Sequence, residues 1–572
     1  MKKLKKFIKG YEIPAILAPL FKLFEAATEL VVPLVIAALI DKGIAGADTA
    51  YTVKMAIILA LLGIVGLAFS LTAQYFAAYA SCGSAAKMRS ALFRHIGTLS
   101  YKELDGIGTS TLITRITADS NQVQNGLNLA LRLLLRSPIV VFGAMIMAFT
   151  IDVGSALTFA VIIPLLSIVV FGIMLLTMPM YKKVQRYLDK ILSKSRENLA
   201  GTRVIRAFCK ENDEVEDFER KNADLTAMQK FVGRVSSLMN PITYVLINAA
   251  VIALIYIGAL KVDSGALTSG QVVALYNYMS QILVELIKLA NLIITITKAL
   301  ASAGRIGKVF ETENSLVYGE CDFSKESAEI TFDNVSLRYS GAQEDSLEGV
   351  SFSAKAGQTV GIIGGTGSGK TSLVNLIPRF YDASGGKITL CGRDISEYTK
   401  QSIRENIGVV PQKAVLFSGT IRENMLWGTK NATDEEILRA IDIAAGSSII
   451  EDKGGLDSYI EQGGRNLSGG QRQRLTIARA LVRQPKILIL DDSASALDYA
   501  TDAALRRAIR ENTKDSIVFI VSQRTSSIMH ADKIILLDDG HVCAIGTHDE
   551  LLAGSELYRE IYETQFEKGA SI

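Results

Sequence analysis

Long apolar stretches fill the first half of the chain, and short ones fill the second. Six stretches of the ~20 residues that a helix needs to cross a bilayer lie at about 13–40, 53–80, 128–150, 155–178, 237–260 and 270–299. From about Ala328 onward, short β-type runs alternate with helical stretches. This pattern predicts a membrane-spanning all-α domain of six helices at residues 1–305, a linker at 306–327 and a soluble α/β domain at 328–572.

Two of the polar segments between the apolar stretches, near 81–127 and 179–236, are long, charged and helical in their periodicity. We expect these helices to continue past the bilayer by several turns, because twenty extra residues extend a helix by roughly 30 Å. The segments near Thr109–Asp119 and Asn198–Phe208 are then expected at the tips of the extensions, where short helices can contact another domain.

Basic residues predict the orientation. Those of the N-terminal segment and the two long polar segments all fall on one side of a six-span topology: Lys2, Lys3, Lys5, Lys6 and Lys9, then Lys87, Arg89, Arg94, Lys102 and Arg115, then Lys182, Lys183, Arg186, Lys194, Arg203 and Arg206. Such residues concentrate on the cytoplasmic side. We therefore expect a multi-pass protein of the cytoplasmic membrane, with its N-terminus and soluble domain in the cytoplasm and a basic segment on the inner membrane face.

Composition narrows the class of protein. The chain has 572 residues, of which 49% are hydrophobic, a mean hydropathy of +0.28 and a net charge of only +3. So small a charge gives no basis for nucleic-acid binding. The five cysteines are scattered without a CxxC pair, which is typical of reduced thiols rather than a zinc site or a disulfide framework.

Charged side chains lie inside two of the predicted spans. Their spacings of three and four residues place neighbours on one helical face, and intramembrane charges usually face a bundle interior or a wet cavity. Two interpretations remain open: a substrate cavity or gate, or internal ion pairs that hold the helices together. The candidate residues, with two tyrosines of the sixth span, are Lys22, Glu25, Glu29, Tyr276, Tyr278, Glu285 and Lys288.

A phosphate-binding loop opens the soluble domain. "TVGIIGGTGSGKTSLVNLI" at 359–377 reads as a strand, a glycine-rich turn and a helix start, and it fits GxxxxGK[ST]. Glycines let backbone N–H groups surround phosphates at a helix N-terminus, Lys370 reaches the β- and γ-phosphates, and Thr371 offers its hydroxyl to Mg²⁺. The predicted ATP-binding residues of this loop are Gly364, Thr366, Gly367, Ser368, Gly369, Lys370, Thr371 and Ser372.

Two further motifs follow. "ILILDD" predicts a buried parallel strand that ends at Asp491, a position that suits a carboxylate near Mg²⁺. In "NLSGGQRQRLTIARAL" at 466–481, Ser468, Gly469 and Gly470 open a helix whose N-terminus offers a second anion site. This second site has no lysine of its own, so it is expected to close over a nucleotide held by another copy of the domain.

The order GGTGSGKT, LSGGQ, ILILDD and SALD resembles the ATP-binding cassette (ABC) ATPases, and six spans ahead of one such domain resemble a half-transporter of the exporter type. The resemblance implies ATP and Mg²⁺ as cofactors, and a second half-transporter, the lipid bilayer and a small-molecule substrate as partners. It implies that Tyr339 stacks on adenine, that Gln412 senses Mg²⁺ and that Asp498 communicates across a dimer. The signature that would complete a partner's site is Leu467, Ser468, Gly469, Gly470 and Gln471.

The chain departs from the family pattern at two positions of the hydrolytic site. Asp492 stands where the family has a glutamate as general base, and Gln523 stands where it has a histidine that contacts the γ-phosphate. Aspartate is one methylene shorter, and misplacement on the order of 1 Å can cost about 10²-fold in rate. Glutamine donates a hydrogen bond but carries no charge. We expect a site that binds ATP and hydrolyses it slowly, in a heterodimer whose partner supplies the missing pair.

The resulting hypothesis is ATP-driven export of amphipathic small molecules, of the multidrug type. The alternatives are a lipid or peptide exporter, an ATP-binding regulatory subunit without transport of its own, and a homodimer in which Asp492 is a slow but sufficient base. An importer ATPase fits poorly, because importers of this family usually keep membrane and ATPase parts on separate chains.

Overall fold

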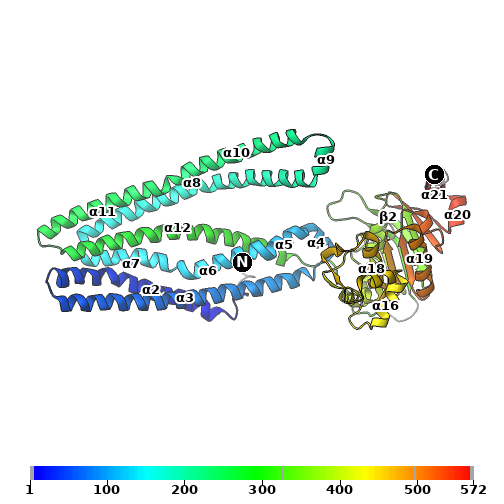
Figure 1. Ribbon diagram of the computed structural model, residues 1–572, viewed down its shortest axis with the longest axis horizontal. Coiled ribbons are helices and arrows are strands. Elements are labelled where there is room, and N and C mark those ends of the chain that lie inside the picture. Colours follow the sequence, from blue (N-terminus) through cyan, green and yellow to red (C-terminus); the bar gives the residue numbers. More distant parts are fainter. Residues whose placement is uncertain (1–5, 324–327, 494–496, 567–572) are drawn as a thin grey trace. The chain divides into compact units, whose positions relative to one another are not determined.

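The computed structural model describes residues 6–323, 328–493 and 497–566 (Figure 1). The chain forms two compact units, one of residues up to Gly97 with Ser110–Thr312, the other of Thr98–Thr109 with the residues from Glu313 onward. Lys2, Lys3 and Lys5 of the predicted basic segment lie outside the described residues, as do 324–327 of the expected linker. Residues 306–311 of that linker are helical, because the last membrane helix continues to Glu311.

The first unit is helical. Within the described residues, six helical stretches are long and apolar enough to span a membrane: Glu12–Ile44, Thr49–Ile96, Thr109–Ile151, Val153–Ala200, Glu211–Asp263 and Ser269–Glu311. The six predicted spans are thus confirmed. The last five stretches have 43 to 53 residues, which at 1.5 Å per residue far exceeds a hydrocarbon core of about 30 Å. The predicted helical extensions therefore exist.

Local breaks divide these stretches. Two of the breaks are turns of π-helix, so a single stretch can contain more than one helix. The helices of this unit are α2 (Glu12–Ala38), η1 (Leu39–Ile44), α3 (Thr49–Ile96), α5 (Thr109–Thr114), η2 (Arg115–Asp119), α6 (Ser120–Leu133), α7 (Arg136–Ile151), α8 (Val153–Ala200), α9 (Thr202–Ala207), α10 (Glu211–Ser237), α11 (Met239–Asp263) and α12 (Ser269–Glu311).

Side-chain caps start the helices that follow the short connections. The carboxylates of Asp48 and Asp152 accept hydrogen bonds from the first turns of α3 and α8, and Thr268 forms a capping box with Gln271 at the start of α12. Each cap satisfies a backbone N–H that has no partner inside the helix. In Figure 1, α8 runs back along α10 and α11, with α9 at the turn between them. The segment predicted near 198–208 is therefore a helical tip.

The second unit contains two main β-sheets. The strands in order are β1 (Glu329–Leu337), β2 (Leu347–Lys355), β3 (Thr359–Gly364), β4 (Gly385–Leu390), β5 (Arg393–Asp394), β6 (Ile407–Val410), β7 (Gly419–Thr420), β8 (Tyr459–Ile460), β9 (Ile487–Asp491), β10 (Ile517–Val521), β11 (Lys533–Asp538) and β12 (His541–Gly546). One sheet has the order β2-β1-β4-β5 and the other β12-β11-β3-β10-β9-β6. In the second sheet all neighbours are parallel except β11 and β12. Apolar runs such as Ile487–Leu490 are fully covered there, as expected for strands buried on both faces.

Helices surround these sheets. They are α4 (Tyr101–Ile107), α13 (Lys370–Leu376), α14 (Lys400–Asn406), α15 (Ile421–Met425), α16 (Asp434–Ile443), α17 (Ser447–Lys453), α18 (Gly469–Leu481), α19 (Tyr499–Asn512), α20 (His548–Gly554) and α21 (Glu556–Phe566). The α/β prediction for this region is confirmed. The parallel sheet places the carboxyl ends of β3, β9 and β10 at one edge, which is where ligands bind in such sheets.

The helix α4 comes from the first half of the sequence but belongs to the second unit. It corrects the predicted position of the first docking segment: Thr109–Asp119 is not a separate tip but the beginning of the third membrane stretch. The docking helix lies just before it. The reason is the capping box of Ser100 and Glu103, which starts a new helix, and Gly108 with a φ of 81°, which ends it.

Candidate functional site

The phosphate-binding loop connects β3 to α13. Gly367 and Gly369 have φ values of 90° and 93°, a left-handed conformation that favours glycine. A Cβ atom on Gly369 would lie 2.6 Å from the carbonyl oxygen of Ser346, so a larger residue has no room there. The loop therefore takes the shape that its glycines predict, with backbone N–H groups at the start of a helix.

Lys370 lies inside this loop. Its side-chain ammonium donates to the carbonyl oxygens of Gly364, at 2.9 Å, and Gly365, and to the hydroxyl of Ser368 at 3.2 Å. Burial lowers the pKa of Lys370, and the nearby carboxylates of Asp492 and Asp491 oppose that shift. The ammonium thus contacts neutral oxygens near the N-terminus of α13, a position from which it can bind an anionic ligand.

A cavity of about 450 Å³ opens beside the loop. It brings together residues from six separate stretches of sequence. Most of the predicted ATP-binding residues line it, among them Thr366, Lys370, Thr371 and Gln412, and so do Asp491, Asp492 and Gln523. The volume falls within the usual range for small-molecule sites, ~300–1,000 Å³.

Asp491 ends strand β9, and the hydroxyl of Thr371 donates to its Oδ1 at 3.2 Å. Asp491 is 6% exposed, and burial, opposed mainly by the Thr371 hydrogen bond, raises the pKa of its carboxyl. A hydroxyl beside a buried carboxylate, with the amide of Gln412 lining the same cavity, is an all-oxygen donor set that suits Mg²⁺. These three residues fit the metal, which would draw the nucleotide's phosphates toward the loop.

Replacing Asp491 with asparagine should stabilise the nucleotide-free second unit. Because the folded-state pKa lies above the unfolded one, the wild type loses stability as the pH rises through that raised pKa, whereas asparagine cannot ionise. The variant should melt roughly 2–4 °C higher at neutral pH, the shift for ~1 kcal/mol in a domain of this size, with a smaller gain at acidic pH. Trp427, the one tryptophan of the chain, reports the melt by fluorescence and lies in this unit.

Asp457→Asn is the matched control, because the hydrogen bond from Arg422 lowers the pKa of the exposed Asp457 and its amide should bring no gain. An equal increase in melting temperature for Asp491→Asn at acidic and neutral pH would contradict the burial argument.

The two residues that depart from the family pattern line the same cavity. Asp492 follows β9 with a φ of 45°, its backbone N–H donates to Val521 at 3.0 Å, and its Oδ2 accepts from the amide of Gln412 at 3.4 Å. Gln523 follows the adjacent parallel strand β10, and its carbonyl accepts from the side chain of Gln565 at 2.8 Å. Both substitutions therefore concern one chemical site.

The signature segment lies at the start of α18. Ser468 caps this helix and shares a capping box with Gln471. Ser468 and Gly469 are exposed at the N-terminus of the helix. Within the described residues, none of Leu467–Gln471 lines the cavity that holds Lys370. Asp498 caps α19 by accepting from the backbone N–H of Thr501 at 3.1 Å, and the side-chain and backbone hydrogen bonds from Thr501 lower the pKa of Asp498. The exposed start of α18 and the cavity at Lys370 are thus two separate features of this chain.

Tyr339 lies near the phosphate loop rather than in the cavity lining. Its hydroxyl donates to Ser372 at 3.1 Å, and its ring meets that of Tyr381 edge-on, with centroids 5.1 Å apart. Tyr381 in turn donates to Asp105 of α4 at 2.6 Å, and Tyr101 of α4 packs on Phe380. Sequence analysis missed this contact of α4, although aromatic residues at 101, 380 and 381 were a visible signal.

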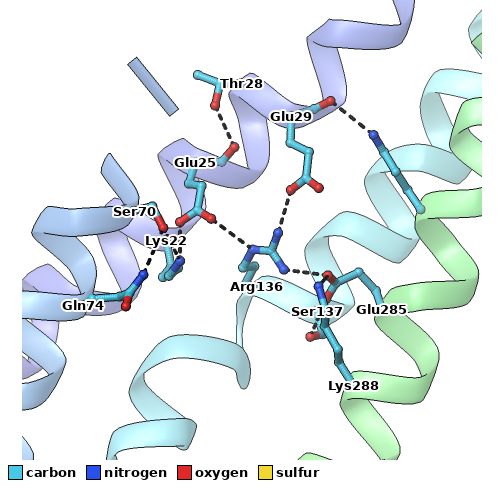
Figure 2. A network of polar contacts seen from close by, with 11 residues as sticks. Lys22, Glu25, Thr28, Glu29, Ser70, Gln74, Arg136, Ser137, Glu285 and Lys288 are labelled. Atoms are coloured by element: carbon cyan, nitrogen blue, oxygen red, sulfur yellow. Dashed lines mark hydrogen bonds and ion pairs between the residues drawn. The ribbon is translucent and has the colours of Figure 1, made fainter. Parts of the chain in front are cut away.

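The intramembrane charges form one network (Figure 2). Its centre is Arg136, the first residue of α7, which is 6% exposed and was not predicted. Its guanidinium binds Glu29 of α2 and Glu285 of α12, each at 2.6 Å, and lies 3.9 Å from Glu25. The side chain of one arginine therefore joins three helices.

Further contacts extend the network. Glu285 also accepts from Ser137 and Lys288, both at 2.8 Å, while Lys22 pairs with Glu25 and donates to Ser70 of α3 at 3.1 Å. Of the two interpretations left open by the sequence, these contacts favour internal ion pairing. Glu29 and Lys288 keep 39% and 43% of their side chains exposed, so two charges of opposite sign still face outward.

The two candidate cavity tyrosines differ. Tyr276 is 43% exposed, whereas Tyr278 is fully buried among apolar residues of the helices and donates to the carbonyl of Leu30 at 2.6 Å. The prediction that Tyr278 lines a cavity is wrong, because its position on α12 faces the packed helices and its hydroxyl finds a backbone partner there.

Comparisons with known proteins agree with this architecture. A family model described as "ABC transporter transmembrane region" matches residues 15–286, and one described as "ABC transporter" matches residues 347–495. The chain is 36% identical to the uncharacterized ABC transporter ATP-binding protein YfiB of Bacillus subtilis, covering 100% of both chains. It is 34% identical to the probable multidrug resistance ABC transporter ATP-binding/permease protein YheI of the same organism, covering 99% of this chain and 97% of that one. A solved bacterial Atm1-family ABC exporter with ATP bound superimposes with a TM-score of 0.82 at 25% identity, over 98% of this chain and 99% of that one.

Fold and site together define an ATP-coupled membrane transporter with six spans and one nucleotide-binding domain. The chain belongs to the ABC transporter family, in which it is a half-transporter of the exporter type.

Proposed function

We propose that this chain exports amphipathic small molecules across a cytoplasmic membrane, with its N-terminus and nucleotide-binding domain in the cytoplasm. The similarity to a probable multidrug resistance transporter supports the substrate class, and the basic residues at one end of the helices support the orientation. ATP with Mg²⁺ would bind between the phosphate loop and Asp491. ATP drives transport in so far as it favours one membrane conformation over the other.

The proposal includes a hydrolysis-impaired site. The main support is that Asp492 and Gln523 line the same cavity as Lys370, Thr371 and Asp491, which match the family's nucleotide-binding residues. The nucleotide-binding residues match the family pattern. Asp492 is one methylene shorter than the family's glutamate, and the neutral amide of Gln523 replaces a histidine that can carry charge. Such a site holds ATP and turns it over slowly.

The proposal also includes a heterodimer. The exposed start of α18 carries an intact signature, LSGGQ, away from the chain's own cavity. A signature that is retained beside a weakened base makes sense if it completes the active site of a partner with the family's glutamate and histidine.

Ser468→Arg tests the heterodimer in the assembled pair. The arginine should block the partner's nucleotide site and reduce the ATPase of the pair by more than tenfold, while ATP binding to this chain's own loop is unchanged. Thr433→Arg is the matched control, because Thr433 forms the same capping box at the start of α16 outside the signature. An equal loss of ATPase activity in both variants would show that losing a helix cap, and not the signature, causes the effect. Unchanged ATPase activity in Ser468→Arg would overturn the proposal that this chain completes a partner's site.

A regulatory subunit that binds ATP without transport is the second candidate, favoured by the same Asp492 and Gln523. Reconstituted vesicles distinguish the two: ATP-dependent uptake of an amphipathic dye by the pair supports export. ATP binding without flux supports the regulatory role. Lipid or peptide substrates remain alternatives for the transported molecule, tested by competition with that dye.

A further inference from the structure

A second cavity lies in the first unit, apart from the charge network. It has a volume of about 250 Å³, is open on one side and is lined by the N-terminal segment and the helices α3, α6 and α12. Its walls are mostly apolar and include Phe7, Ile8, Met88, Leu127, Ile296 and Leu300. An apolar cavity of ~150 Å³ already binds a benzene molecule, so this one has room for a segment of hydrocarbon chain.

One polar group in the wall has no partner among the described residues. Ser84 of α3 is 5% exposed and lines the cavity, and its hydroxyl makes no hydrogen bond to any residue that the structure describes. Ser81, one turn earlier, also lines the cavity, but its hydroxyl donates to Ala78 and accepts from Asn128, each at 3.2 Å. A buried hydroxyl without a partner is unfavourable. The Ser84 hydroxyl therefore indicates a ligand that brings a polar atom to an otherwise apolar space.

Positive charge gathers on the segment that walls the cavity. Lys6 and Lys9 flank the buried Phe7 and are exposed, and the ammonium of the exposed Lys87 donates to the carbonyl of Lys9 at 3.0 Å. The carboxylate in this segment, Glu12, accepts from the N–H of Gly10 at 2.6 Å. Among the described residues 6–12 together with Lys87, three ammonium groups stand against one carboxylate, so the segment beside the cavity carries net positive charge.

We propose that this cavity binds an anionic phospholipid of the leaflet beside the N-terminus. The acyl chain occupies the apolar space, Ser84 donates to a glycerol ester oxygen, and the lysines hold the phosphate headgroup. Apolar burial and attraction of basic residues to anionic lipids are the two forces that hold segments at a membrane surface. The lipid would fasten the N-terminal segment to α3, α6 and α12. This inference concerns a bound lipid at the cavity and does not depend on the exported substrate.

Brominated lipids test the proposal in the full-length chain in nanodiscs. Because Trp427 is the one tryptophan, a Trp427→Phe background carries Leu300→Trp as the reporter at the cavity. Ile64→Trp, at an exposed position of α3, is the matched control. Two mixtures are compared: brominated phosphatidylglycerol as a minor component in phosphatidylcholine, and brominated phosphatidylcholine as a minor component in phosphatidylglycerol. The first should quench the cavity reporter about fivefold more strongly than the second, as expected for attraction of an anionic lipid by basic residues. The control reporter should show no preference.

Lys6→Gln, Lys9→Gln and Lys87→Gln combined should reduce this preference to about one. Ser84→Ala should weaken quenching by both lipids without changing the preference, because both carry the glycerol ester oxygens. Equal quenching by both lipids at the cavity reporter, or a preference that survives the triple variant, would overturn the proposal. Absence of quenching by either lipid would also overturn it, because the cavity is then dry or covered by protein. Native mass spectrometry of the unchanged chain provides a second readout, in which retained phosphatidylglycerol should exceed retained phosphatidylcholine.

Discussion

Replacing Asp492 with glutamate and Gln523 with histidine should raise the ATPase rate of the chain alone by on the order of 10²-fold. The longer side chain moves the carboxylate by about one methylene toward the γ-phosphate, and misplacement on the order of 1 Å accounts for an effect of this size. Both positions line the cavity that holds Lys370, so the new residues should reach the same nucleotide. Steady-state phosphate release with Mg²⁺ and ATP measures the change.

The single substitutions separate the two contributions. Asp492→Glu should account for most of the gain, since general-base catalysis typically contributes 10²- to 10⁴-fold, and Gln523→His should add to it. Lys370→Ala in the gain-of-function background is the control for contaminating ATPase and should abolish the activity. A double variant that hydrolyses no faster than the wild type would show that these two residues do not limit the site.

Removing Arg136 should destabilise the membrane unit by about 3–5 kcal/mol, the typical cost of breaking a buried ion pair by removing one partner. Arg136→Ala leaves Glu285, which is 2% exposed, without its guanidinium and removes the partner of Glu29. Chemical unfolding of the purified protein in mixed micelles, followed by helical circular dichroism, measures the loss.

Two variants of the same network control this prediction. Lys288→Ala removes a half-exposed cation while Glu285 keeps Arg136 and Ser137, so it should cost no more than about 1 kcal/mol. Arg136→Ala combined with Glu285→Ala should recover part of the lost stability, because the stranded charge is removed as well. If Arg136→Ala lowered the free energy of unfolding no more than Lys288→Ala does, the network would not stabilise the packing of these helices.

The sequence predicted most of the fold because its patterns are local. Apolar length identifies membrane helices, and the alternation of β-type and helical runs identifies the sheet domain, with the phosphate loop at the β3–α13 junction. The ends of elements were less predictable. The capping box of Ser100 and the turn at Gly108 moved the docking helix to Tyr101–Ile107, and α12 continued to Glu311.

The residues of the nucleotide cavity were predictable because motifs encode backbone shape. The charge network was harder, since its centre depends on which helices pack together. A signal for Arg136 was nevertheless present: Lys22 and Lys288 leave one of the three carboxylates Glu25, Glu29 and Glu285 without a cation. An arginine inside the third span was the natural candidate. The burial of Tyr278 depended on helix rotation, which apolar length does not determine.

The most direct test of the impaired site uses the purified chain alone. Photolabelling with an azido-ATP analogue, with steady-state hydrolysis measured on the same preparation, separates binding from turnover, and Asp492→Asn serves as the comparison. The account predicts strong labelling, very low hydrolysis and little further loss in Asp492→Asn. Vigorous hydrolysis by the chain alone that Asp492→Asn abolishes would contradict it.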